Sequence, residues 1–164
     1  MPLTPGELAE RMHRLADDLN HFGDVTVTDK GERTGRRRIE YFLAAPGVPG
    51  VHDEVVGRYR ETFSRTGHEW LFAKYTYEYL DKIHNRRLAY HLHPLERGGP
   101  LVAHAHCGAL SLGALDESDD GETHEHLRAV AVSLTEANGE FMACYFARRP
   151  PDCAAFRPLQ VPRE

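Results

Sequence analysis

The sequence predicts a single α+β domain in which helices pack on one face of a central antiparallel sheet. The chain has 164 residues, enough for one domain with a core but not for two. Apolar residues recur at helical spacing near both ends, and from Trp70 to Cys107 they alternate with polar residues as in strands. A small barrel is the alternative architecture. We expect the domain to cover residues 1–149, followed by an extended Pro-rich tail over 150–164.

The first predicted element is an amphipathic helix that begins at Pro5. Thr4 is suited to cap it, and Glu7 stands three residues after the cap, where it completes a capping box. The helix should end before Gly23. Its apolar face is predicted to contain Leu8, Met12, Leu15 and Leu19.

A hairpin and a second helix are predicted next. Residues 24–28 and 38–43 both alternate, and the Gly-containing segment 29–35 between them is typical of a turn. After the Pro- and Gly-rich segment 46–50, a helix is predicted to end near Gly67. Its apolar stripe would consist of Val55, Val56, Tyr59 and Phe63.

Between Trp70 and Cys107 the alternation separates two chemically different faces of a sheet. One face is apolar and should form the core; it contains Leu71, Ala73, Tyr75, Tyr77, Tyr79, Leu88, Tyr90, Leu92, Ala103, Ala105 and Cys107. The other face contains Phe72, Lys74, Thr76, Glu78 and four histidines, His91, His93, His104 and His106.

The four histidines form two His-x-His pairs, His91-Leu-His93 and His104-Ala-His106. Residues i and i+2 of a strand point to the same face, so each pair should be co-facial. If a loop over residues 94–100 closes an antiparallel hairpin, one register places His93 opposite His104 and His91 opposite His106. Directly opposed side chains have Cβ atoms about 4.5–5.5 Å apart. The spacing therefore predicts four imidazoles on one patch.

Two other side chains are expected beside this patch. A two-residue turn at 84–85 would place Glu78 opposite His91, and Lys74 shares the parity of the histidines. The candidate catalytic residues are therefore His91, His93, His104, His106, Glu78 and Lys74. The same four histidines are the candidate metal ligands.

Three functions fit these residues. Clustered imidazoles suit zinc, iron, manganese or copper, and an open coordination position would make such a centre catalytic. Paired histidines can also cleave an RNA phosphodiester without metal by acid–base catalysis, with Lys74 holding the phosphate. The third interpretation is a polar sheet face in a non-enzymatic, partner-binding module. Of the three, the RNA-cleaving protein is the favoured prediction.

The composition of the chain restricts its expected binding partners and its expected location in the cell. The net charge of −5 argues against broad nucleic-acid binding, although it leaves room for a small RNA site. No apolar run approaches the roughly 18 residues of a membrane span, and the N-terminus lacks the pattern of a secretory signal, so a cytoplasmic protein is expected. The sequence has an odd number of cysteines, Cys107, Cys144 and Cys153, and none of them forms a Cys-x-x-Cys motif. This pattern favours reduced thiols over a disulfide framework.

The last part of the chain is predicted to contain an acidic loop and a closing helix. Residues 116–122 are acidic and lack periodicity, and His124-Glu-His126 is a third His-x-His pair without an assigned role. Ser133 and Glu136 form a second capping box. The helix that follows should bury Leu134, Ala137, Phe141, Cys144 and Tyr145, with Asn138 and Gly139 as a weak point inside it.

Four short motifs resemble a known family. In order they are Tyr75-Thr-Tyr-Glu-Tyr, Arg87-Leu-Ala-Tyr-His-Leu-His-Pro, Val102-Ala-His-Ala-His and Val132-Ser-Leu-Thr-Glu. Their succession resembles that of small, mostly actinobacterial proteins related to TumE-like components of toxin–antitoxin loci, over roughly residues 70–147. The resemblance implies a toxin-like protein that acts on RNA, is held by an antitoxin partner and uses His91, His93, His104 and His106. It implies nothing about the oligomeric state.

Overall fold

The computed structural model of the protein describes residues 1–44, 55–95, 99–110 and 126–159. Within these residues it contains two α-helices, seven strands and a short 3-10 helix at Cys153–Ala155. In chain order the elements are α1 (Pro5–Asn20), β1 (Asp24–Arg33), β2 (Arg36–Ala44), β3 (Val55–Thr66), β4 (Glu69–Asp81), β5 (Arg86–Pro94), β6 (Leu101–Gly108), β7 (Leu127–Arg128) and α2 (Leu134–Phe146).

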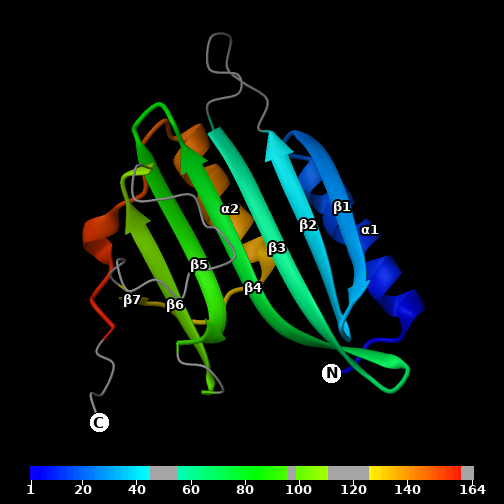
Figure 1. Cartoon of the computed structure of the whole chain (residues 1–164). Coiled ribbons are helices and arrows are strands. Elements are labelled where there is room, and N and C mark those ends of the chain that lie inside the picture. Colours follow the sequence, from blue (N-terminus) through cyan, green and yellow to red (C-terminus); the bar gives the residue numbers. More distant parts are fainter. Residues whose placement is uncertain (45–54, 96–98, 111–125, 160–164) are drawn as a thin grey trace.

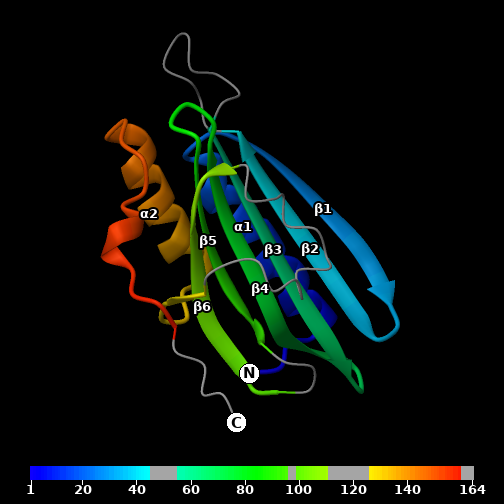
Figure 2. The ribbon, with the colours of Figure 1, turned by 60° about the vertical axis from the view of Figure 1, so that its left-hand side comes forward.

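The strands form one open antiparallel sheet in the order β1 to β7, so each strand pairs with its neighbours in the chain. Both helices lie against the same face of this sheet, and the other face carries neither of them (Figures 1 and 2). The predicted α+β domain is confirmed, and the sheet does not close into a barrel. Within the described residues, neither helix has the length and apolar content needed to cross a membrane.

The two helix starts follow their capping residues. At α1, the Thr4 hydroxyl accepts from the Glu7 backbone N–H while the Glu7 carboxylate accepts from the Thr4 backbone N–H, which satisfies two donors at the helix end. Ser133 and Glu136 make the same reciprocal pair at α2. Both predicted capping boxes are confirmed, and they fix where the apolar faces of the helices begin.

The predicted helix over 55–67 is wrong, because these residues form strand β3. Tyr59 and Phe63 are four residues apart, a spacing that places them on one face of a helix and also on one face of a strand. Glu61 between them is buried on the same side, which only the strand period allows. Pairing with β2 on one side and β4 on the other satisfies the backbone of β3 along its length.

The core between the sheet and the helices is rich in tyrosine, as the alternation predicts. Tyr79 and Tyr90 stack on Phe141 of α2, with ring centroids 5.5 and 6.1 Å apart. Two buried hydroxyls find partners across the core: that of Tyr59 donates to Asn138 at 2.6 Å, and that of Tyr77 donates to Glu61 at 2.7 Å. This core fixes the orientation of β4 and β5, and thus of the side chains on the opposite face.

A β-bulge near the start of β4 changes the predicted faces there. Lys74 pairs with Thr62 but Phe72 pairs with Phe63, so β4 has one extra residue at this point. The bulge inverts the alternation before it. Phe72, expected on the histidine face, contacts the ring of the core residue Phe63 with centroids 5.5 Å apart. Leu71, expected in the core, is exposed, and Phe72 keeps the same exposed fraction of 37% at the edge of the core.

The C-terminal segment is tied to the sheet by a disulfide between Cys107 and Cys153. The prediction of reduced thiols is therefore wrong for these two cysteines, while Cys144 is free. The two bonded cysteines are 46 positions apart in the sequence, and no local spacing indicates that the tail returns to β6. Beyond the disulfide, the backbone N–H of Leu159 donates to the carbonyl of His126 at 2.7 Å, so the tail also pairs with the residue before β7.

Candidate functional site

The four predicted histidines lie together on the face of β5 and β6 that is opposite the helices. His91 pairs with His104 across the two strands, whereas we predicted His91 opposite His106 and His93 opposite His104. The predicted register is wrong by two residues. Because the side-chain period of a strand is two, an even shift leaves every side chain on its own face. The predicted cluster therefore forms, and the ring centroids of His93 and His104 are 4.7 Å apart.

The predicted contact between Glu78 and His91 is wrong. The turn between β4 and β5 spans residues 82–85 instead of 84–85, and this places Thr76 opposite His91 and Glu78 opposite Ala89. The buried Glu78 carboxylate forms an ion pair with Arg87 at 2.7 Å, and Arg58 lies 3.7 Å from it. A buried carboxylate requires such partners. Glu78 is thus neutralised by arginines beside the cluster.

Lys74 lies on the histidine face, as its parity predicts. It pairs with Thr62 across β3 and lines a pocket of about 240 Å³ together with Arg38 and Arg60. This pocket is separated from His91 by Thr76, which lines the pocket and pairs with His91. The catalytic role assigned to Lys74 stays a prediction.

A fifth histidine joins the cluster from the chain just before β7. The ring centroid of His126 lies 4.8 Å from that of His104 and 4.9 Å from that of His106. The sequence contains a signal for it, the third His-x-His pair, but its place beside β6 depends on a long connection. Its companion His124 and the acidic segment 116–122 lie outside the described residues.

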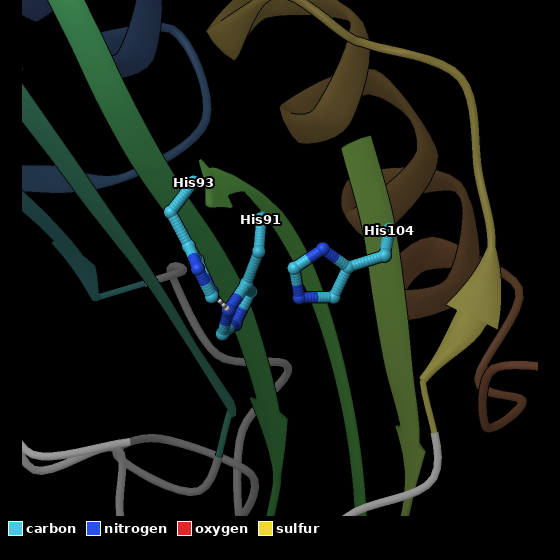
Figure 3. A group of neighbouring side chains, drawn as sticks. All are labelled: His91, His93 and His104. Atoms are coloured by element: carbon cyan, nitrogen blue, oxygen red, sulfur yellow. Dashed lines mark hydrogen bonds between the residues drawn. The ribbon is translucent and has the colours of Figure 1, made fainter. Parts of the chain in front are cut away.

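The five histidines form two overlapping groups of three. His91, His93 and His104 make the first group, and Figure 3 shows their rings turned toward one another from β5 and β6. His104, His106 and His126 make the second. In each group the three candidate ligand nitrogens all lie within 4.8 Å of one another, and His104 belongs to both. Either group can hold a metal ion.

Backbone carbonyls orient two of these rings. The Nδ1 of His93 lies 2.8 Å from the carbonyl oxygen of Pro94, and the Nδ1 of His104 lies 3.2 Å from that of Val102. A carbonyl only accepts, so each Nδ1 carries the proton and donates. The lone pair of each neutral ring is then on Nε2, which faces the cluster. A ring N–H donated to a carbonyl is the usual support of a metal-binding histidine.

Burial keeps the central histidines neutral. The pKa of His91 is held well below its usual range, first by loss of hydration and then by the neighbouring imidazoles and Arg87. Burial, with His93 and His126 nearby, lowers the pKa of His104 to about 4, although its bond to Val102 opposes the shift. The Nε2 of His104, which carries the lone pair of that ring, is buried without a hydrogen-bond partner among the described residues. Such an atom costs about 1–3 kcal/mol, which a bound cation would offset.

Lowering the pH is expected to destabilise the metal-free protein between about pH 6.5 and pH 4. In the unfolded chain His104 takes up its proton near pH 6.5, whereas in the folded protein it does so only near pH 4. The unfolded state binds more protons across this interval, so the free energy of unfolding falls as the pH falls. Urea unfolding at a series of pH values measures the effect. His104→Gln should show a shallower decline, and identical slopes for variant and parent would contradict the assignment.

Comparison with protein-family models, with curated proteins and with solved structures finds no match for this chain. The resemblance to TumE-like proteins therefore stays a prediction. What the fold and the cluster define is an α+β protein with a histidine-rich centre that can hold a metal ion.

Proposed function

We propose that the protein binds one divalent transition-metal ion through His104 and two further histidines. The observation that carries the proposal is the grouping of a His104 nitrogen with one nitrogen from each of two further histidines, all within 4.8 Å of one another. The Nε2 of His104 is buried, and its Nδ1 is already engaged by a carbonyl. A neutral imidazole with a lone pair directed into a cluster is a ligand that needs no proton loss at neutral pH.

The stoichiometry follows from His104. Both groups of three require this residue, yet its Nδ1 donates to Val102, so Nε2 alone is left to coordinate. One nitrogen lone pair serves one ion. The two groups are therefore alternative or merged sites for a single ion, and we expect one ion per chain.

Zinc is the metal that we propose for this set of three histidine ligands. The Nδ1 of His91 lies 3.4 Å from the Nε2 of His93, the contact marked by the dashed line in Figure 3. Two nitrogens bound at about 2.0–2.1 Å to a tetrahedral zinc ion lie about 3.4 Å apart. Three histidine ligands leave the fourth position open to water or substrate, the arrangement of catalytic zinc centres, where the ion supplies a Lewis acid and an activated water. Iron, manganese and copper are the other metals that such ligands accept.

The direct test is titration of chelator-treated protein with Zn²⁺ and with Co²⁺, whose visible spectrum reports tetrahedral nitrogen ligation. We expect one ion per chain, and His91→Ala should weaken binding by on the order of 100-fold. His13→Ala is the matched control because His13 is exposed on α1, away from the cluster. Metal content of the protein as purified distinguishes zinc from iron, manganese and copper. Failure of every one of these ions to bind would refute the proposal.

The second candidate is metal-free RNA cleavage by a toxin that an antitoxin protein restrains. The cations Arg38, Arg60 and Lys74 beside the histidines favour it, since they can hold a phosphodiester. The lowered pKa of His104 disfavours it, because a group with a pKa of about 4 is protonated in about one molecule in a thousand at pH 7 and is a poor general acid. Expression should arrest growth and cleave RNA in a histidine-dependent, EDTA-resistant way. Intact RNA in growing cells would rule this candidate out.

A further inference from the structure

We propose that the pocket lined by Arg38, Arg60 and Lys74 binds the phosphate group of a small ligand whose other end reaches the metal ion. This inference rests on the proposed metal site and adds a substrate class to it. The pocket lies on the same face of the sheet as the histidine cluster, and it is formed by β2, β3 and β4. We call it the cationic pocket.

The lining of the cationic pocket carries an excess of positive charge. Its volume is about 240 Å³, and among the described residues its wall consists of two arginines, one lysine, two threonines and Tyr75, with no carboxylate side chain. Glu40 lies on the same face of the sheet, opposite Arg60, and its Oε1 is 3.2 Å from the Nε of Arg38 and 3.0 Å from the Nε of Arg60. One carboxylate shared between two guanidinium groups holds them in place without cancelling the charge of the pocket.

Arg60 presents its guanidinium in a form suited to an oxyanion. It donates to Glu40 through Nε, so within the described part of the chain both terminal amino groups keep their hydrogens for a ligand. An arginine fork donates two parallel hydrogen bonds to a phosphate, and a lysine adds a point charge. The hydroxyls of Thr62 and Thr76 are further donors in the same wall. A tetrahedral anion with several oxygens matches this set better than a planar carboxylate.

The sheet register connects the cationic pocket to the metal ligands. His104 pairs with His91, His91 with Thr76, and Thr76 with Arg60, so the four residues form one row across β6, β5, β4 and β3. Neighbouring strands are about 4.8 Å apart, which places Arg60 about 10 Å from His91 along this row. Thr76 is the one residue between them and has a short side chain. A ligand with a phosphate at one end and a metal-binding oxygen at the other can therefore span both.

The test uses 4-carboxyphenyl phosphate, inorganic phosphate and benzoate as probes, with binding measured by calorimetry on zinc-loaded and metal-free protein. Zinc binding is first measured without any probe. A protein that does not bind zinc would then refute the metal site itself, independently of the result for the pocket. We expect 4-carboxyphenyl phosphate, whose carboxylate can bind the metal ion while its phosphate occupies the pocket, to bind the zinc-loaded protein at least ten-fold more tightly than the metal-free protein. The backbone amide resonances of Thr62 and Thr76 should shift with inorganic phosphate in both forms.

Lys74→Gln and Arg60→Gln should each lower phosphate affinity about ten-fold, while Arg33→Gln, which removes one positive charge from an exposed position outside the pocket, should leave it unchanged. Lys74 is exposed, so its replacement leaves the fold intact. Equal affinity in all three variants would overturn the cationic pocket. Benzoate binding the metal-free protein as tightly as inorganic phosphate would overturn the assignment to phosphate. Affinity for 4-carboxyphenyl phosphate that depends on Lys74 but not on zinc would overturn the link to the metal.

Discussion

Replacing His104 with alanine is expected to abolish metal binding, lowering the affinity by on the order of 1,000-fold or more. The reason is that both groups of candidate ligands contain this residue. His93→Ala and His126→Ala each damage only one group, so each should lower the affinity by no more than about ten- to 100-fold. Isothermal titration with Zn²⁺ on the three variants measures this order directly.

The same three variants distinguish one ion from two. If His104 were dispensable, with His93→Ala and His126→Ala each removing one of two ions, the proposal of a single shared ion would fail. His104 is fully buried, so its alanine variant also loses packing. Circular dichroism and urea unfolding show whether the fold survives, and His104→Gln, which keeps most of the volume, serves as the second variant.

The location of the site was predictable from the sequence because it depends only on parity. His91, His93, His104 and His106 reach one face in any register that is shifted by an even number of residues. The register itself was not predictable. It depends on how many residues each turn uses, and a four-residue turn at 82–85 separates Glu78 from His91 although both alternate as expected.

Contacts between distant segments explain the remaining errors. The spacing of Tyr59 and Phe63 fits a helix as well as a strand, and pairing with β2 and β4 decides the matter. The bulge that turns Phe72 toward the core arises from the fit between β3 and β4. His126 reaches the cluster only because the chain returns along β6. None of these is encoded in a short window of sequence.

Breaking the Cys107–Cys153 disulfide with Cys153→Ser is expected to lower the free energy of unfolding by about 4 kcal/mol. The bond closes a loop of 46 residues, and the chain entropy that such a loop restores to the unfolded state has about this magnitude. Urea unfolding of the oxidised parent and the variant measures the difference. Cys144→Ser is the matched control because Cys144 is partly buried but unbonded, and equal losses in the two variants would contradict a role for the bond.

The disulfide should also support the His126 side of the histidine cluster more than the side of His91 and His93. The tail that it anchors donates a backbone hydrogen bond from Leu159 to His126, whereas His91 and His93 are held by β5 between two full strands. Loss of the bond therefore frees the backbone next to His126 and leaves the first group in place. In Cys153→Ser we expect metal affinity to fall as far as in His126→Ala and no further, so that combining the two substitutions adds nothing. An additive loss in the double variant would show that the disulfide supports the whole centre instead of its His126 side.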